Sequence, residues 1–277
     1  FKKQCGYHLQ HNIPKKIINM SYNNLIYAIK ERVSTISINR PKKLNALNIE
    51  TFSEIDHAVK SSVSNPEVRL IVITGVGDKA FVAGADIKEF VKFTMEEGFQ
   101  LSESGHKILT ETIENCPKPI IAAINGYALG GGLELAMACH LRVASDNSKM
   151  GLPEVSLGVI PGYGGTQRLP QLIGKGRALD MIMTGKMINA DQALDYGLIN
   201  YKTTVDQLMT LTDDLAKKIL LNSSNAIKHS IKSINAYNKS GVDGFKVEMN
   251  EFGKCFQTND FVKGTTAFLN KTKPDFN

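Results

Sequence analysis

Cysteine is scarce in this sequence, and its four cysteines lie far apart, at Cys5, Cys116, Cys139 and Cys255. They form no CxxC pair, so the sequence predicts neither a structural zinc site nor a disulfide framework. The histidines also lack metal-ligand spacing, and no metal is expected. Reduced thiols indicate a cytosolic or organelle-matrix protein, and Cys139, inside an apolar helix, is predicted to be a small buried residue.

Long hydrophobic runs are missing as well. No stretch reaches the roughly 18 apolar residues of a membrane-spanning helix, so none is predicted. No arginine-rich arm occurs either, and the formal net charge of +6 is spread along the chain. Such a balance suits an anionic ligand such as a nucleotide or phosphate, but it does not favour nucleic-acid binding.

The length of 277 residues and the hydrophobic content of 42% predict one large α/β domain, alone or with a small helical appendage. Residues 1–19 contain no acidic residue and precede Met20. We interpret them as a disordered or non-native extension, with a mitochondrial transit peptide as the alternative. The expected location is therefore the cytoplasm of a bacterial-type cell, or else the mitochondrial matrix.

Hydrophobic periodicity predicts a mixed core over residues 20–200 and a helical region over residues 201–277. An amphipathic helix is predicted to begin after an Asn48 cap, because apolar residues then recur every three or four positions. A strand, this helix and a second strand in succession indicate a right-handed crossover. The predicted strands are 33–39, 70–74, 120–124, 141–144 and 198–202. Further helices are predicted at 95–115, 133–139, 165–173, 176–183, 190–196, 204–221, 223–238, 242–257 and 260–270.

A glycine-rich turn, Gly126 to Gly132, separates the strand at 120–124 from the helix at 133–139. Its last three residues are glycines, which let the backbone approach a ligand and present N–H groups at a helix N-terminus. The spacing differs from the G-x-G-x-x-G of dinucleotide loops. The turn is therefore either an anion or oxyanion site or a tight strand-to-helix packing turn.

Two glutamates are candidates for acid–base chemistry. Glu134 lies one turn inside the helix after the glycines, in an otherwise apolar stretch, where a carboxylate without a purpose is costly to bury. Its alternative role is that of an acid at a helix start. Glu154 follows Pro153 in a loop, and by itself it is better interpreted as a solvated loop acid. If both face one pocket, they form a general acid–base pair.

Several motifs occur in a fixed order: GADIK at 84–88, NGYALGGGLE at 125–134, GLPE at 151–154 and PGYGGTQRL at 161–169. Together they resemble the crotonase (enoyl-CoA hydratase/isomerase) superfamily, in particular short-chain enoyl-CoA hydratases, over about Ile26 to Phe268. The resemblance implies an α/β fold of the ClpP/crotonase type, a spiral of ββα units with a C-terminal helical trimerisation region. It also implies a homo-trimer, or a homo-hexamer built as a dimer of trimers.

The implied reaction is the reversible syn addition of water to a 2-trans-enoyl-CoA, which gives a 3-hydroxyacyl-CoA. Fatty-acid β-oxidation, butyrate metabolism and branched amino-acid breakdown all use this chemistry. No separate cofactor is implied, because coenzyme A is part of the substrate. Rival interpretations are a double-bond isomerase, an RNA-binding relative and an inactive scaffold; isomerases often retain only one of the two acids.

The resemblance also implies roles for individual residues. Glu134 and Glu154 map onto the catalytic acids, with Glu134 activating water toward C3 and Glu154 protonating C2. The backbone N–H groups of Ala85 and Gly131 map onto the oxyanion hole. Leu152 departs from the pattern, because many hydratases have Gln there. The residues implied to border the acyl-CoA are Lys43, Ala46, Leu47, Gly84, Ala85, Asp86, Ile87, Lys88, Gly130, Pro161 and Gly162.

Overall fold

The fold was analysed in a computed structural model that describes residues 21–237 and 239–276. The extension predicted at residues 1–19 lies outside the described residues. The main sheet has six strands in the order β1-β2-β3-β5-β7-β10, and only the β1–β2 pair is antiparallel. Its strands are β1 (Leu25–Lys30), β2 (Val33–Ile38), β3 (Leu70–Gly75), β5 (Ile120–Ile124), β7 (Leu141–Ser145) and β10 (Tyr201–Thr203).

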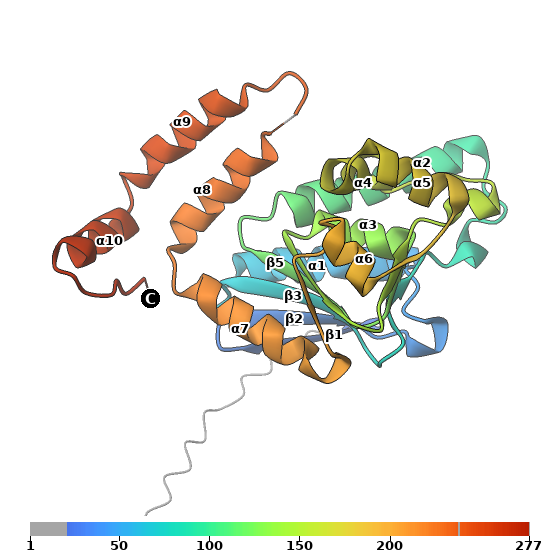
Figure 1. The fold of residues 1–277 in the computed structure, drawn as a ribbon, viewed down its shortest axis with the longest axis horizontal. Coiled ribbons are helices and arrows are strands. Elements are labelled where there is room, and N and C mark those ends of the chain that lie inside the picture. Colours follow the sequence, from blue (N-terminus) through green and yellow to red (C-terminus); the bar gives the residue numbers. More distant parts are fainter. Residues whose placement is uncertain (1–20, 238, 277) are drawn as a thin grey trace, which may run out of the picture.

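The central strands β3 and β5 are buried along their whole length, as their unbroken apolar runs predicted. Their side chains alternate between two clusters. Ile71 and Ile73 face the main core with helix α1 (Ile49–Ser64), whereas Leu70 and Val72 face helix α7 (Leu208–Leu220). In Figure 1, α7 lies below the strands and α3 above them, so the sheet is covered on both faces.

The predicted start of helix α1 is confirmed. The Asn48 side chain accepts a hydrogen bond from the N–H of Thr51 at 3.0 Å, which is N-cap geometry. Strands β2 and β3, on either side of this helix, are parallel neighbours, as a crossover requires. The predicted strands at 33–39, 70–74, 120–124 and 141–144 agree with the structure to within one residue at each end.

A second sheet of four short strands, in the order β4-β6-β8-β9, was not predicted. It consists of β4 (Ala80–Ala83), β6 (Tyr127–Leu129), β8 (Lys149–Gly151) and β9 (Ile188–Asn189). The prediction of a plain turn at 126–132 was wrong, because β6 lies within it. Strands of two to four residues are too short for an alternating pattern to be legible in the sequence. Each of β3, β5 and β7 is followed by a short strand and then a helix, which is a repeated ββα unit.

The predicted helix at 95–115 changes its character partway. Helix α2 (Met95–Lys107) begins with a Thr94–Glu97 capping box, and the chain then continues as a π-helix from Ile108 to Glu114. A π-helical segment has one more residue per hydrogen-bonded turn and is often found at functional sites. Periodicity predicted the helical span but not the change in hydrogen bonding.

The remaining helices are α3 (Gly131–Ala138), α4 (Gly165–Ile173), α5 (Lys175–Thr184), α6 (Ala190–Asp195), α8 (Ser224–Asn235), α9 (Gly244–Cys255) and α10 (Asn259–Leu269). The observed strand near 198–202 is β10, which pairs with β7 in the main sheet. The core therefore continues past residue 200 through β10 and α7. The part that stands beside the core in Figure 1 comprises α8, α9 and α10, which we call the C-terminal arm.

Cys116 and Cys139 are buried and Cys255 is half-buried, and none of the three forms a disulfide. The buried position predicted for Cys139 is confirmed, and burial raises the pKa of its thiol to about 12. Over residues 21–237 and 239–276, no helix is both long enough and apolar enough to cross a membrane.

Candidate active site

Three strands of the second sheet lead into the predicted motifs at one edge. Strands β4, β6 and β8 run parallel, and their last residues lie side by side. Ala85, Gly131 and Glu154 follow these strand ends by two or three residues. The carboxyl ends of parallel strands share one edge of a sheet, which is the usual position of a site in such folds. The structure therefore brings together motifs that are separated in the sequence.

The backbone N–H groups of Ala85 and Gly131 donate to no acceptor among the described residues. Gly131 is the first residue of α3, where an N–H has no partner within the helix. The two segments approach each other closely, since a Cβ on Gly130 would lie only 3.7 Å from the Cα of Gly84. Gly84 and Gly130 both have positive φ, at 98° and 50°, which favours glycine.

The third glycine of the turn has a different role. A Cβ on Gly132 would lie 2.1 Å from the carbonyl oxygen of Val82 on β4. This glycine is therefore required for close packing of α3 against the sheet. Both alternatives considered for the turn thus apply, but to different residues: Gly132 packs, while Gly131 presents a free N–H.

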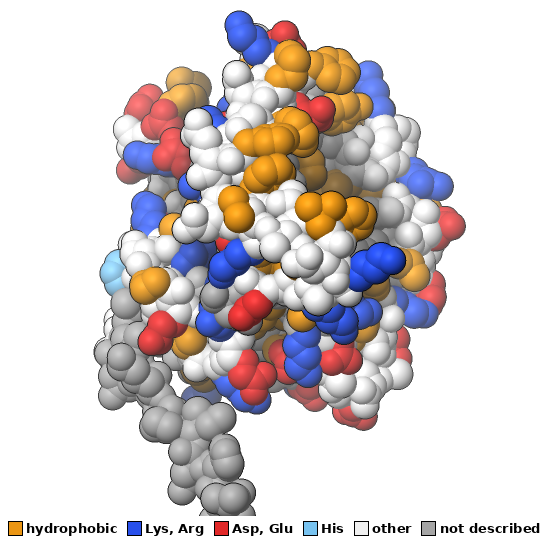
Figure 2. All heavy atoms as spheres, turned by 90° about the vertical axis from the view of Figure 1, so that its left-hand side faces the viewer, with side chains coloured by type: hydrophobic (Ala, Val, Ile, Leu, Met, Phe, Trp, Pro, Cys, Tyr) orange, Lys and Arg blue, Asp and Glu red, His pale blue; other side chains and the backbone are white. Residues whose placement is uncertain are grey.

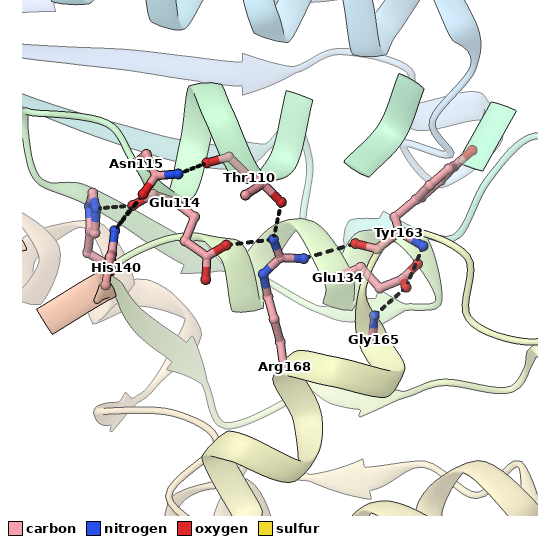
Figure 3. A network of polar contacts seen from close by, with 9 residues as sticks. Thr110, Glu114, Asn115, Glu134, His140, Tyr163, Gly165 and Arg168 are labelled. Carbon is pink, nitrogen blue, oxygen red and sulfur yellow. Dashed lines mark hydrogen bonds and ion pairs between the residues drawn. The ribbon is translucent and has the colours of Figure 1, made fainter. Parts of the chain in front are cut away.

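Glu134 is almost completely buried, with 1% of its surface exposed. Its Oε1 accepts hydrogen bonds from the N–H groups of Tyr163, at 2.8 Å, and Gly165, at 2.7 Å (Figure 3). Glu134 lies in the first turn of α3, as the alternative role of a helix-start acid requires, but its carboxylate also binds another loop. Burial raises the pKa of Glu134, while the two backbone donors and the nearby Arg168 oppose the rise.

Glu154 begins a short 3-10 helix, Glu154–Leu157, and is half-buried. Its Oε1 approaches the glycine turn, since a Cβ on Gly130 would lie 3.0 Å from it. Its Oε2 is buried and has no hydrogen-bond partner among the described residues. Burial raises the pKa of Glu154 to about 7, and the neighbouring Glu134 adds to the rise. The alternative of a solvated loop acid is therefore wrong.

The residues implied to border the acyl-CoA lie on segments that the structure joins. Leu47 and Ala85 form a parallel β-bridge, in which Leu47 donates to Gly84 at 2.9 Å and accepts from Asp86 at 2.7 Å. Asp86 also pairs with Arg40 at 3.0 Å, and this hydrogen bond lowers the pKa of the Asp86 carboxyl. The loop at residues 43–47 and the GADIK motif thus form one wall.

The side chains along this wall differ in exposure. Lys43, Ile87 and Lys88 are exposed, and Ala46 is half-buried. On the opposite loop Pro161 is buried, and the carbonyl of Gly162 accepts a hydrogen bond from Ser102 at 2.6 Å. In the described part of the chain, no three His, Cys, Asp or Glu side chains are grouped as metal ligands.

A cavity of about 290 Å³ adjoins Ala85, and its wall includes a residue that the sequence analysis did not single out, Tyr163. The ring of Tyr163 lies 5.0 Å from that of Phe52, edge to face. The only sequence signal for Tyr163 was its place among the glycines of PGYGG. The other apolar residues of the cavity wall are Leu47, Ile49, Phe52, Phe90, Phe93, Leu101 and Ile108.

Comparison with known proteins identifies the family of this chain. The family described as enoyl-CoA hydratase/isomerase matches residues 28–277. The crotonyl-CoA hydratase of Syntrophomonas wolfei is 43% identical over 258 residues, which are 93% of this chain and 99% of that protein. The short-chain-enoyl-CoA hydratase of Clostridium acetobutylicum is also 43% identical, over 92% of this chain and 97% of its own. The crystal structure of an enoyl-CoA hydratase from Bacillus anthracis matches with a TM-score of 0.85 and 36% identity, covering 91% of this chain and 98% of that one. The chain therefore belongs to the enoyl-CoA hydratase/isomerase family, the crotonase enzymes, and has their fold.

Proposed function

We propose that this protein is an enoyl-CoA hydratase, which reversibly adds water syn to a 2-trans-enoyl-CoA and forms a 3-hydroxyacyl-CoA. The observation that carries the proposal is the pair of unlike carboxyls, Glu134 and Glu154, beside two free backbone N–H groups. Glu134 accepts two hydrogen bonds that favour its ionised form. Glu154 has a buried oxygen without a partner, which favours its protonated form.

The free N–H groups of Ala85 and Gly131 suit the thioester oxygen. When water attacks C3, negative charge develops on this oxygen as an enolate. Donors that are already oriented toward that position stabilise the transition state without reorganising, and each can contribute about 3–4 kcal/mol. The position of Gly131 at the start of α3 adds the positive end of the helix dipole.

The two glutamates then divide the proton transfers. Ionised Glu134 takes a proton from the attacking water, whose oxygen bonds to C3, and Glu154 gives its proton to C2. In the reverse direction the same groups exchange roles and remove water. A double-bond isomerase only moves a proton along the chain, so the retention of both acids favours hydration.

The wall formed by the loop and the GADIK motif is proposed to hold coenzyme A. Leu47 and Ala85 offer a continuous backbone edge for the pantetheine arm. Lys43 and Lys88 lie exposed on this wall and can meet phosphate charge. Gly130, Pro161 and Gly162 would border the acyl end of the substrate.

We further propose that the acyl chain is short, as the printed names of the two relatives at 43% identity indicate for those proteins. The ring of Tyr163 supports this. One edge lies against Gly131, where a Cβ would meet it at 3.3 Å, and the other against Gly105, where a Cβ would meet it at 2.2 Å. The ring thus stands between the glycine turn and the cavity, whose lining includes neither glutamate.

The assembly is proposed to be a homo-trimer, or a homo-hexamer built as a dimer of trimers. Figure 2 shows hydrophobic side chains gathered on the side of the molecule where the C-terminal arm lies. Tyr237, Phe245 and Phe268 are each about four-fifths exposed there, and apolar surface of this extent usually marks an interface. Sedimentation equilibrium should give three or six times the 30.4 kDa of one chain.

The function is tested by mixing the protein with crotonyl-CoA and following the loss of the conjugated thioester absorbance, then repeating with medium and long enoyl-CoAs. We expect the highest kcat/KM with the four-carbon substrate. Glu154→Gln should lower kcat at least about 100-fold, because the neutral amide cannot deliver a proton. A wild-type protein that is inactive on all three chain lengths would rule out the hydratase function.

A further inference from the structure

Arg168, on the first turn of α4, is a buried cation next to the loop that holds Glu134. Only 7% of its surface is exposed. Its Nη1 donates to the carbonyl oxygen of Tyr163 at 3.0 Å, and its Nη2 donates to Glu114 at 2.7 Å and to the hydroxyl of Thr110 at 3.0 Å. The guanidinium therefore bridges the PGYGG loop and the π-helix (Figure 3).

The contact with Tyr163 matters because the same residue binds Glu134. The N–H of Tyr163 donates to Oε1 of Glu134, while its carbonyl accepts from Arg168. Gly164, the next residue, has a φ of 99°, and a Cβ there would lie 2.2 Å from Nη1 of Arg168. The loop is thus shaped to let the guanidinium reach the Tyr163 carbonyl, and Glu134 is held on the other side of that residue.

The far end of this bridge is also fixed. The carbonyl of Glu114 accepts hydrogen bonds from Nε2 of His140, at 3.1 Å, and from the Asn235 side chain of α8, at 2.6 Å. His140 accepts in turn from the N–H of Ile120 at 2.8 Å. The carboxylate that orients Arg168 therefore belongs to a segment anchored to β5 and to the C-terminal arm, so Arg168 has a rigid support.

We propose that Arg168 is a positioning residue for the reaction: it sets the geometry of the Tyr163–Gly165 donors and supplies a positive charge that favours the ionised form of Glu134 for water activation. Arg168 contacts no reacting atom, and the proposal rests on the hydratase function above. The half-buried ion pair between Arg168 and Glu114 then has a consequence for catalysis besides stabilising the contact between α4 and the π-helix.

The charges around Arg168 make this effect directional. Glu114 pairs with it directly, and the guanidinium opposes the rise that burial causes in the pKa of the Glu134 carboxyl. His106 also faces it, and its pKa is lowered by burial and by this charge. Beyond Glu134 lie Glu154 and the Tyr163 hydroxyl, both of which are affected by the charge of Glu134. Removing Arg168 leaves Glu134 without a nearby cation among these groups.

Three variants separate geometry from charge. Arg168→Met removes both the fork of donors and the charge. Arg168→Lys keeps a charge but cannot make all three contacts, since an ammonium is a point charge without the planar fork. Glu114→Gln leaves the guanidinium in place but neutralises its anchor. Arg69→Met is the matched control, because Arg69 is also buried, at 9% exposed, and binds Ser224 and Asn222 far from this loop.

We expect Arg168→Met to lower kcat on crotonyl-CoA by about 30- to 100-fold, because a displacement of the catalytic base by about 1 Å has an effect of this size. KM should change less than about threefold. The acidic limb of kcat should move to higher pH. Arg168→Lys should keep the acidic limb of kcat near its wild-type position, while kcat falls about tenfold. Glu114→Gln should lower kcat by less than Arg168→Met does. Arg69→Met should leave kcat and the position of its acidic limb unchanged, even if the variant is less stable.

The proposal is overturned if folded Arg168→Met keeps kcat within about threefold of wild type, or if its acidic limb does not move. If that variant fails to fold, Arg168→Lys and Glu114→Gln test the proposal instead, and kcat values within about threefold of wild type in these variants overturn it. An infrared titration of ¹³C-labelled glutamate, with the Glu134 band assigned by its loss in Glu134→Gln, reads the ionisation of Glu134 without any substrate. A higher Glu134 pKa in Arg168→Met supports the proposal even if the wild type proves inactive, and an unchanged pKa in that variant overturns it.

Discussion

Two glutamates in this protein are almost equally buried, Glu134 in the core and Glu251 in the C-terminal arm, at 1% and 3% exposed. Glu134 is held by two neutral backbone N–H groups. Glu251 accepts hydrogen bonds from Lys232 and Lys254, each at 2.7 Å, and from His229 at 2.6 Å. Burial raises the pKa of Glu134, whereas the hydrogen bonds from Lys232, Lys254 and His229 lower the pKa of Glu251 to about 2.

The difference shows that burial alone does not identify a catalytic acid. Two lysines and a histidine hold Glu251 ionised and tie α8 to α9, so Glu251 has no proton to give and its role is structural. The neutral donors around Glu134 orient its carboxylate without fixing its charge so firmly. A group that must gain and lose a proton during a reaction needs the second kind of environment.

The largest expected effect comes from making the same substitution, glutamate to glutamine, at both positions. Glu134→Gln should lower kcat on crotonyl-CoA at least about 100-fold, because the amide cannot accept the proton of water. Glu251→Gln should leave kcat within about twofold and instead lower the free energy of unfolding by on the order of 1–3 kcal/mol, since it weakens charge-assisted hydrogen bonds. Steady-state kinetics and denaturant unfolding measure the two effects. Comparable losses of kcat in both variants would show that the arm acts on catalysis.

The sequence predicted one of these two glutamates and missed the other. Glu134 stood out because its neighbours in α3 are apolar. Glu251 lies in the segment VEMNEFGK, where charged and apolar residues alternate with helical spacing and an acid predicts a solvated face. Its partners His229 and Lys232 come from α8, about twenty residues away, and a packing arrangement of that kind has no local signal.

The absence of a local signal also explains which other features of the fold and the site could not be predicted from the sequence. The long buried strands and the capped α1 could be predicted because their patterns are local. The short strands β4, β6 and β8 could not, although their shared edge assembles the site. The contacts of Glu134 with Tyr163 and Gly165 join residues about thirty positions apart. Only the resemblance of whole motifs indicated that these segments meet.

A second test uses pH, because the two regions should respond at opposite ends of the pH range: activity should fall at high pH, and the stability of the arm should fall at low pH. The pKa of Glu154 is raised to about 7, so deprotonation above pH 7 removes the general acid, and kcat/KM should fall by about tenfold per pH unit. The pKa of Glu251 is lowered to about 2. The stability it contributes is therefore present above about pH 4.5, the usual value for glutamate, and is lost as the pH falls from there toward 2.

The two pH dependences are measured separately. Initial rates at subsaturating crotonyl-CoA give kcat/KM between pH 5 and 9, and denaturant unfolding of wild type and Glu251→Gln gives their difference in stability between pH 2 and 6. We expect that difference to shrink as the pH falls, because Glu251 becomes protonated and resembles its amide. A difference that stays constant down to pH 2 would contradict the ion-pair account.

The smallest expected effects come from two glycines, one beside each glutamate. A Cβ on Gly165 would lie 2.9 Å from Oε1 of Glu134, whereas a Cβ on Gly253, in α9, would meet nothing within 4 Å. Gly165→Ala should therefore shift Glu134 and lower kcat by about tenfold. Gly253→Ala should keep kcat and raise the free energy of unfolding by up to about 1 kcal/mol, because alanine favours the helix interior. If Gly253→Ala destabilised the protein instead, this face of α9 would be packed in the assembly, and a smaller oligomer by sedimentation would confirm it. If Gly165→Ala kept full activity, the geometry of Glu134 would tolerate more displacement than two hydrogen bonds to a fixed loop allow.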